Sequence, residues 1–432
     1  MATLATAIDK QTNLEKSKSP LAFRALLLFT FLYYTRPEDL IPGLSVIPIE
    51  KIVGGIALIA LIATLASGKV KKKLPLELKL LLLLFAHLII AIPFAYWRAG
   101  AFVTVFERFS KGVTVALLVT LIVENLDQLR KLLWVQAASL VVTTIASILI
   151  HHTDQGRLIG ALGGIFENPN DLAINISINW PLCMAFVLLT RGMAKTAIWT
   201  VGILAMLLGV VLTYSRSGLL AMGMAVVICV WLFGIRGKRF VLIAGAVILS
   251  IVGVGVILGT PHYLLRIESI FLGNIPGSGD HGSWEARRVL FGDAVNEAVN
   301  HPIFGVGAGN FGAATRTWLV SHDTYAEFAA EGGLPALFLF LTIMFLAFRN
   351  LRKIRLLSVY EQNEEIRVFT GALWASLSAF VIGALFASFE YQLFPYFMVA
   401  YTSVLYRWCA AHSEKLDAAE MSRKRPAALR LY

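Results

Sequence analysis

The chain has 432 residues, of which 57% are hydrophobic and only 15% are charged. An ordinary soluble protein carries roughly a quarter charged residues, so this composition argues against a soluble enzyme. The net charge of +11 would suit a nucleic-acid-binding protein, but membrane proteins also gather Lys and Arg in their cytoplasmic segments. The cysteines Cys183, Cys229 and Cys409 lie in or beside apolar segments and form neither a metal-ligand pattern nor a disulfide framework.

Apolar segments recur along the whole chain, and most are long enough to cross the hydrocarbon core of a bilayer, which takes about 20 residues. The sequence therefore predicts an all-α polytopic membrane protein with about twelve transmembrane helices. The predicted spans are 21–34, 52–67, 77–95, 110–124, 132–150, 171–190, 196–213, 218–234, 240–259, 334–348, 369–388 and 392–408.

The distribution of positive charge sets the orientation. With the N-terminus in the cytoplasm, most of the 38 Lys and Arg residues fall in inside segments, among them 69–73 and 349–355. This bias predicts an even number of spans and explains the net charge without a nucleic-acid partner. We expect no cleaved signal peptide, because no short basic start with an apolar core and cleavage site is present. The predicted organisation is a cytoplasmic tail (1–20), nine spans (21–259), a long outer loop (260–333), three spans (334–408) and a basic cytoplasmic tail (409–432).

The long outer loop contains a predicted amphipathic helix, WEARRVLFGDAVNEAVN (284–300). Leu290, Ala294 and Ala298 recur at i, i+4 spacing, and Phe291 and Val295 form a second such row. This spacing predicts that one face of the helix packs against the rest of the protein.

A glycine-rich segment, HPIFGVGAGNF (301–311), follows the loop helix. It lacks the preceding strand and the following Lys of a nucleotide-binding loop, so we expect no nucleotide site there. The next segment, HDTYAEFAAEGG (322–333), predicts a short helix that is broken at Gly332 and Gly333 before the tenth span.

Arg216 lies at the outer turn between the seventh and eighth predicted spans, in TYSRSG (213–218). An arginine at a span end commonly extends to the membrane interface without binding anything. Here the small polar neighbours Ser215 and Ser217 leave the guanidinium group free to hold a ligand. Its planar donor set suits a phosphate or diphosphate.

Four further candidate residues lie in the long outer loop. Arg287 and Arg288 point about 100° apart on a helix, so we expect one to face a site and the other to meet solvent or Glu285. His322 is either an ordinary packed or exposed histidine or a proton acceptor near neutral pH. Glu331 lies nine residues further on and is interpreted as a structural residue, facing away from His322 and bonding loop backbone or an arginine.

The segment NPNDLA (168–173) predicts the outer start of the sixth span, with Asp171 or Asn170 as the cap. The asparagine side chains are also candidates for binding sugar or phosphate. The sequence has no HxxH, CxxC or DxD pattern, so we expect no metal site.

These pieces together resemble the O-antigen ligase and O-antigen polymerase superfamily. The resemblance covers about residues 160–345 and rests on five pieces in the expected order. They are NPNDLA, YSRSG, an Arg-bearing loop helix before HPIFGVGAGNF, HDTYAEFAAEGG, and an apolar span.

The resemblance implies a GT-C-like, metal-independent glycosyltransferase at the periplasmic face of the bacterial inner membrane, with a periplasmic loop between spans nine and ten. Arg216 matches the family's membrane-edge arginine, and His322 matches its proposed catalytic histidine. Arg287 best matches the loop arginine, because Phe291 follows four residues later, and Arg288 is the second candidate. The substrate-binding candidates are Arg216, Arg287, Arg288, Asn170, Ser215, Ser217 and Tyr325.

The implied partners are an undecaprenyl-diphosphate-linked glycan donor, a lipid A–core acceptor and the lipid bilayer, with no cofactor, metal or nucleic acid. The arginines would neutralise the leaving diphosphate, and His322 would take the proton of the acceptor hydroxyl. Polymerisation of O-antigen or protein O-glycosylation would use the same residues with another acceptor. A twelve-span transporter is a third hypothesis, but its polar features would lie near the bilayer midplane rather than at the outer rim.

Overall fold

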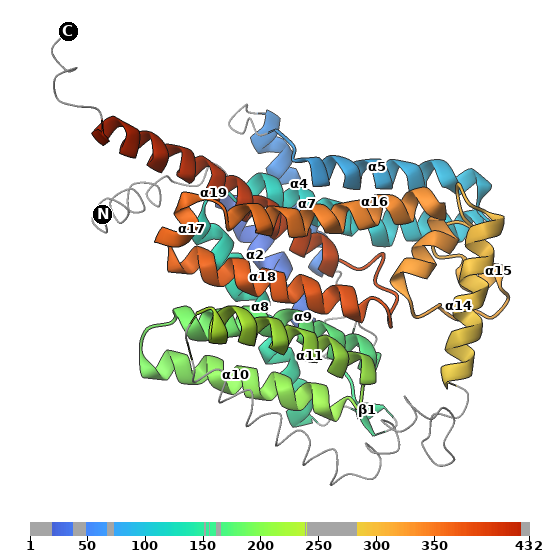
Figure 1. Cartoon of the computed structure of the whole chain (residues 1–432). Coiled ribbons are helices and arrows are strands. Elements are labelled where there is room, and N and C mark those ends of the chain that lie inside the picture. The colour runs from blue at the N-terminus through green and yellow to red at the C-terminus, as the bar shows by residue number, and fades with distance from the viewer. Residues whose placement is uncertain are drawn as a thin grey trace.

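The computed structural model describes residues 20–37, 49–66, 73–150, 153–154, 156–160, 166–237, 239 and 283–424. Almost all of this part is helical, and Figure 1 shows long helices that run side by side. The described residues contain one small antiparallel pair of strands, β1 (Thr153–Asp154) and β2 (Arg157–Leu158). The predicted ninth span, 240–259, lies outside the described residues.

Most of the helices are long enough to form the body of the bundle. They are α2 (Pro20–Thr35), α4 (Ile49–Ala66), α5 (Leu76–Ala91), α7 (Ser110–Ile122), α8 (Leu126–Ile150), α9 (Pro169–Leu189), α10 (Met193–Leu212), α11 (Arg216–Cys229), α14 (Ser283–Asn300), α16 (Thr324–Ile354), α18 (Glu364–Gly383) and α19 (Phe394–Lys424). The shorter helical segments are η2 (Ile92–Phe94), α6 (Arg98–Val103), η3 (Thr104–Phe109), η4 (Val230–Ile235), α15 (Phe311–Ala314) and α17 (Ser358–Gln362).

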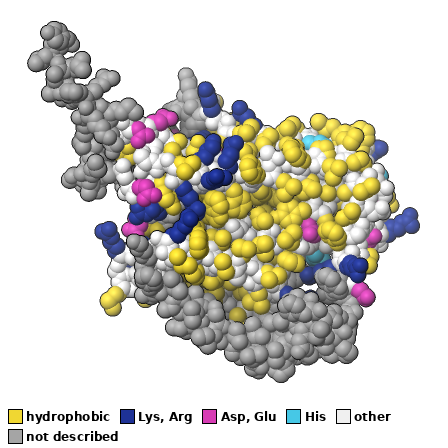
Figure 2. Space-filling view, in the orientation of Figure 1, with side chains coloured by type: hydrophobic (Ala, Val, Ile, Leu, Met, Phe, Trp, Pro, Cys, Tyr) yellow, Lys and Arg dark blue, Asp and Glu magenta, His cyan; other side chains and the backbone are white. Residues whose placement is uncertain are grey.

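Seven helices in the described residues are long and apolar enough to cross a membrane. Figure 2 shows hydrophobic side chains covering the middle of the molecule, as expected for a surface that faces lipid. The prediction of an all-α, multi-pass membrane protein is thus confirmed, whereas the count of twelve spans stays a prediction. The seven helices are Leu76–Phe94, Leu126–Ile150, Pro169–Leu189, Met193–Leu212, Arg216–Ile235, Thr324–Ile354 and Glu364–Gly383.

Helices α9 and α18 form the centre of the bundle. Their most apolar stretches are 78% and 72% buried, against 33% for α5 and α10, which lie at the periphery. Small residues allow the central helices to approach closely. A Cβ atom at Gly218 would lie 2.3 Å from Ala173, and one at Gly383 would lie 2.5 Å from Ile174. Larger residues at either position would push α11 or α18 away from α9.

Buried hydrogen bonds between side chains fix the relative positions of helices that are far apart in the sequence. Gln136 on α8 donates to Oδ1 of Asn179 on α9 at 2.6 Å, and the hydroxyl of Tyr401 on α19 donates to Gln136. Asn350 on α16 donates to Glu77 on α5 at 2.7 Å. Each pair satisfies polar groups that would otherwise be costly to bury, so the helices cannot slide past one another freely.

The predicted loop helix is α14, which lies across one end of the bundle in Figure 1. Its Leu290, Ala294 and Ala298 are buried, as the spacing predicted. The second predicted row is not part of the core, because Phe291 and Val295 are 48% and 44% exposed. The residues that share the small core under α14 are Leu290, Ala294, Phe311, Ala326 and Ala330.

Helix α16 is broken at Gly333, where the backbone has φ 75° and ψ 175°, and this confirms the predicted break. The glycine-rich segment 301–310 fills the break. The N–H of Val306 donates to Ala330, and that of Leu334 donates to Pro302, at 2.8 and 2.9 Å. A side chain at Gly333 would place its Cβ 2.4 Å from the carbonyl oxygen of Ile303, so only glycine allows this contact.

Candidate active site

A cavity of about 530 Å³ opens at the end of the bundle where α9 begins, α16 begins and the α18–α19 connection passes. His322 lines this cavity together with Asn168 and Asp171 from the start of α9. A larger cavity of about 890 Å³ lies at the opposite end, around Arg130 and Arg191, and contains none of the predicted site residues. The smaller cavity is therefore the candidate active site.

His322 sits on the last residues before α16 rather than on the helix itself. Its backbone has φ 57°, a left-handed conformation that is uncommon for a residue with a side chain. The following residue, Asp323, caps α16 by accepting hydrogen bonds of 2.9 Å from the N–H groups of Tyr325 and Ala326. This cap explains what the carboxylate of Asp323 does, and it fixes where the helix starts relative to the histidine.

Thr324 fastens this turn to the connection between α18 and α19. Its N–H donates to the carbonyl of Ala384 at 2.8 Å, and its hydroxyl donates to Ala387 at 2.6 Å. The same hydroxyl accepts a hydrogen bond of 2.9 Å from the N–H of Phe389. His322 is thus held in place by backbone contacts two residues away.

The imidazole of His322 is neutral at physiological pH. Burial, together with the positive charge of Arg287, lowers its pKa from 6.5 to about 4. Arg287 is half-buried, whereas Arg288 is exposed, so Arg287 is the arginine of the pair that lies close to the histidine. An anion bound beside the two groups would raise the pKa of His322 again, because it would stabilise the imidazolium.

The start of α11 is built from small polar side chains. Ser215 caps the helix by accepting a hydrogen bond of 3.1 Å from the N–H of Gly218, and its hydroxyl lies 3.0 Å from that of Ser217. Arg216 is the first residue of α11 and is half-buried. It is not among the residues that line the cavity.

Asn170 joins this turn to the start of α9. Its Oδ1 accepts hydrogen bonds from the Ser215 hydroxyl at 2.8 Å and from Arg157 at 3.0 Å. The predicted cap of α9 is wrong, because the capping residue is Asn168, whose side chain accepts from the N–H of Asn170. The helix begins at Pro169, two residues earlier than a cap at Asn170 requires, and Asp171 instead lines the cavity.

Tyr325 also makes contacts within the protein. Its hydroxyl donates to the carbonyl of Val381 at 3.0 Å, and its ring packs 6.2 Å from that of Phe340. Tyr325 does not line the cavity. Among the predicted site residues, His322 lines the cavity and Arg287 lies close enough to lower its pKa. The others are not among the lining residues: Arg216, Arg288, Asn170, Ser215, Ser217 and Tyr325.

Glu331 bonds loop backbone, as the sequence predicted. It accepts hydrogen bonds from the N–H groups of Gly309 and Phe311 at 2.6 and 2.9 Å, and from the hydroxyl of Tyr391 at 2.7 Å. The expectation that it faces away from His322 is wrong, because both residues line the same cavity. His322 precedes α16, which begins only at Thr324, so helical geometry does not relate its direction to that of Glu331.

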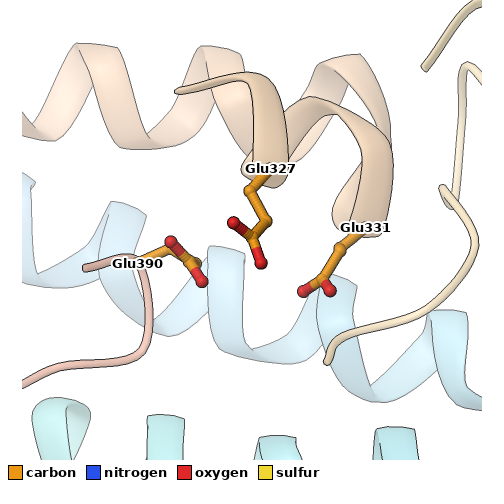
Figure 3. A group of neighbouring side chains, drawn as sticks. All are labelled: Glu327, Glu331 and Glu390. Carbon is orange, nitrogen blue, oxygen red and sulfur yellow. The ribbon is translucent and has the colours of Figure 1, made fainter. Parts of the chain in front are cut away.

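Three buried glutamates form a cluster in the cavity wall, shown in Figure 3. One carboxylate oxygen each from Glu327, Glu331 and Glu390 lies within 4.8 Å of the other two. No local sequence pattern predicted this cluster. The i, i+4 spacing of Glu327 and Glu331 places them on one face of α16, but only the fold brings Glu390 to them.

Three cations line the same cavity and were not predicted either. Arg36 follows α2, Arg108 lies on η3 and Lys111 lies on α7. All three come from the first 150 residues, where the sequence analysis assigned no site residue. Nothing in their local sequence separates them from charges at a membrane interface, and only packing directs them to the cavity that holds His322.

The fold and the cavity together define a multi-pass helical membrane protein with a polar site at one end of its bundle. That site combines a neutral histidine, an adjacent arginine and several cations, a set of groups suited to anionic and hydroxyl-bearing ligands.

Comparison with known protein families identifies the class more closely. Residues 201–341 match the family described as O-antigen ligase, and this segment contains Arg216, Arg287 and His322. The match confirms the predicted resemblance to the O-antigen ligase and O-antigen polymerase superfamily over this segment, which is about a third of the chain. A glycosyltransferase-like function of the ligase or polymerase type follows in general terms. The comparison with curated proteins gave no match.

Proposed function

We propose that this protein is an inverting glycosyltransferase of the O-antigen ligase type. It moves a glycan from undecaprenyl diphosphate to a sugar hydroxyl of lipid A–core at the periplasmic face of the bacterial inner membrane. The observation that carries this proposal is the pairing of a neutral His322 with Arg287 at a cavity of about 530 Å³, within the segment that matches the O-antigen ligase family.

The donor side of the reaction needs positive charge. A diphosphate becomes a good leaving group once its developing charge is neutralised, and preorganised cations do this most effectively. Arg287 beside His322 supplies one guanidinium group, and Arg36, Arg108 and Lys111 line the same cavity. Arg216 is assigned to the diphosphate as well, from its place in the family segment and at the start of α11.

The acceptor side needs a base. The imidazole of His322 takes the proton of the acceptor hydroxyl while the hydroxyl oxygen forms a bond to the anomeric carbon. On the opposite face the bond from that carbon to the diphosphate oxygen breaks, and the diphosphate leaves with the electron pair. The bound diphosphate raises the pKa of His322 from its low value, so the base strengthens when the donor is present.

The same groups would serve a different acceptor. An O-antigen polymerase would extend a lipid-linked glycan, and a protein O-oligosaccharyltransferase would modify a Ser or Thr hydroxyl, with His322 and Arg287 in unchanged roles. Transport is the least favoured alternative, because the clustered charges lie at the end of the bundle.

Genetic complementation tests the proposal. The wild-type gene in a bacterial strain that lacks its own ligase should restore long O-antigen bands on lipopolysaccharide gels, and His322→Ala should abolish them. His301→Ala is the matched control, because His301 is an exposed histidine that pairs with Glu297. It should leave the bands unchanged.

Two other outcomes would assign an alternative function. Longer lipid-linked chains without transfer to lipid A–core would show a polymerase, and glycosylated protein would show an oligosaccharyltransferase. A phenotype in which His322→Ala behaves like wild type would overturn the enzyme proposal altogether.

A further inference from the structure

The buried cluster of Glu327, Glu331 and Glu390 forms no ion pair within the described part of the chain, although three cations line the same cavity. All three glutamates are at most 4% exposed. Carboxylates this close repel one another when they are ionised, and burial makes the repulsion stronger. The cluster therefore needs either protons or a cation.

The hydrogen bonds to two of the glutamates favour their ionised forms. Glu331 accepts from three donors, two of which are backbone N–H groups. Glu327 accepts from the N–H and the hydroxyl of Ser321, at 3.2 and 2.8 Å, and from the hydroxyl of Ser388. A carboxyl group that only accepts hydrogen bonds is stabilised as the carboxylate. These donors offset part of the cost of burying the carboxylates, and a bound cation would supply the rest.

Glu390 supplies a separate observation. It is 4% exposed, and its Oε2 is buried without a hydrogen-bond partner among the described residues. In Figure 3, the carboxyl group of Glu390 lies next to that of Glu327, on the side away from Glu331. A buried carboxylate oxygen without a hydrogen-bond partner lowers the stability of the folded protein unless a ligand binds it.

The spacing of the oxygens fits one metal ion. The three ligand atoms lie within 4.8 Å of one another. Ca²⁺ binds oxygen at about 2.3–2.6 Å, so two ligands of one ion are separated by at most about 5.2 Å. Mg²⁺ binds at about 2.0–2.1 Å and demands near-ideal octahedral geometry, which an arrangement from two separate elements meets less easily.

We propose that Glu327, Glu331 and Glu390 together bind one Ca²⁺ ion. The ion neutralises the carboxylates and gives the orphaned oxygen of Glu390 its partner. It also ties the first part of α16 to the α18–α19 connection, next to the residues that hold His322. The proposed glycosyl transfer does not pass through this ion, so the two proposals stand or fall separately.

Calcium binding to the purified full-length protein in detergent tests this inference. After treatment with a chelator, isothermal titration with CaCl₂ should show one site per chain in the wild type. Glu390→Gln should lose the site, because the amide removes one negative ligand while keeping the size of the side chain. Glu107→Gln changes the charge equally on an exposed glutamate of η3, and it should bind Ca²⁺ like the wild type.

Thermal unfolding gives a second readout. The effect of Glu390→Gln on the melting temperature should have opposite signs with and without Ca²⁺. Saturating Ca²⁺ should raise the melting temperature of the wild type by about 5 °C, because the ion binds only the folded protein. It should leave Glu390→Gln unchanged. Without Ca²⁺, Glu390→Gln should melt above the wild type, since the substitution removes carboxylate repulsion.

A cluster that instead shares protons would behave differently. The wild type would then bind no Ca²⁺, and its melting temperature would be the same with and without the ion. Either result would overturn the inference. Binding of Mg²⁺ or Mn²⁺ with a higher affinity than Ca²⁺ would overturn the choice of ion. Loss of O-antigen transfer would not bear on it, because the readouts are binding and melting temperature.

Discussion

The backbone N–H of Gly309 donates a hydrogen bond of 2.6 Å to Oε2 of Glu331. This contact joins the glycine-rich segment to the first part of α16, and Phe311 adds a second N–H to the same carboxylate at 2.9 Å. The carboxylate therefore organises a loop that has no secondary structure of its own. It connects the cavity wall to the base of α14 through the core that Phe311 shares with that helix.

Gly309→Ala should destabilise the protein by more than about 2 kcal/mol. Gly309 has φ 71°, and its new Cβ would lie 2.2 Å from the hydroxyl oxygen of Thr104. Gly292→Ala on α14 is the matched control, because no atom lies within 4 Å of its Cβ position. It should stabilise the helix by roughly 0.5–1 kcal/mol. Melting temperatures of the two variants in detergent check the prediction, and equal values would contradict it.

The pH dependence of the reaction should reveal the low pKa of His322. Because burial and Arg287 lower that pKa to about 4, the free enzyme keeps a neutral imidazole well below pH 6.5. The acid limb of kcat/KM, which reports the free enzyme, should therefore lie below pH 6.5. The limb of kcat should lie at higher pH, since the bound diphosphate raises the pKa. Initial rates with a lipid-diphosphate glycan donor measure both limbs, and a kcat/KM limb at or above pH 6.5 would contradict the assignment.

The two adjacent arginines of α14 should differ in their effect. Arg287→Ala is expected to lower kcat about 100-fold, as loss of one charge-stabilising donor does in other enzymes. Exposed Arg288 should tolerate the same change with little effect. Removing Arg287 should also raise the pKa of His322, because a nearby positive charge is lost, although burial keeps the pKa below 6.5. NMR titration of labelled histidine checks the shift. The opposite ranking of the two variants would move the site to Arg288.

Arg216 should contribute mainly to binding of the donor, and His322 mainly to the chemical step. Arg216→Ala should weaken binding of an undecaprenyl-type diphosphate lipid about 10-fold or more, the usual cost of losing hydrogen bonds to a charged group. His322→Ala should leave that binding nearly unchanged, because the imidazole serves the acceptor. Titration of both variants with the lipid measures the difference. Similar affinities in the two variants would refute the division.

Sequence patterns predicted the features that arise within one element. The i, i+4 row of Leu290, Ala294 and Ala298 gave the buried face of α14, and the glycine pair marked the break in α16. Such features depend on neighbours three or four residues away. The exposed Phe291 shows the limit, because periodicity cannot say which of two apolar rows meets the protein.

The charged groups of the cavity depend on contacts between distant segments. Glu390 joins Glu327 and Glu331 only because the α18–α19 connection passes the start of α16. The packing of the first helices brings Arg36, Arg108 and Lys111 to the cavity that His322 also lines. Local sequence cannot distinguish such residues from charges at a membrane surface. His322 itself was identified through its place in a family pattern rather than through its surroundings.

The hydrogen bonds of Thr324 anchor the turn that carries His322 to the α18–α19 connection rather than to α14. Its three contacts run to residues 384, 387 and 389, and none runs to α14. A chimera could exchange only residues 283–300 with another protein of the superfamily. It would take the two arginines of α14 from one parent and His322 from the other. The residues of α14 can therefore be exchanged while the turn that carries His322 keeps its hydrogen bonds to the α18–α19 connection.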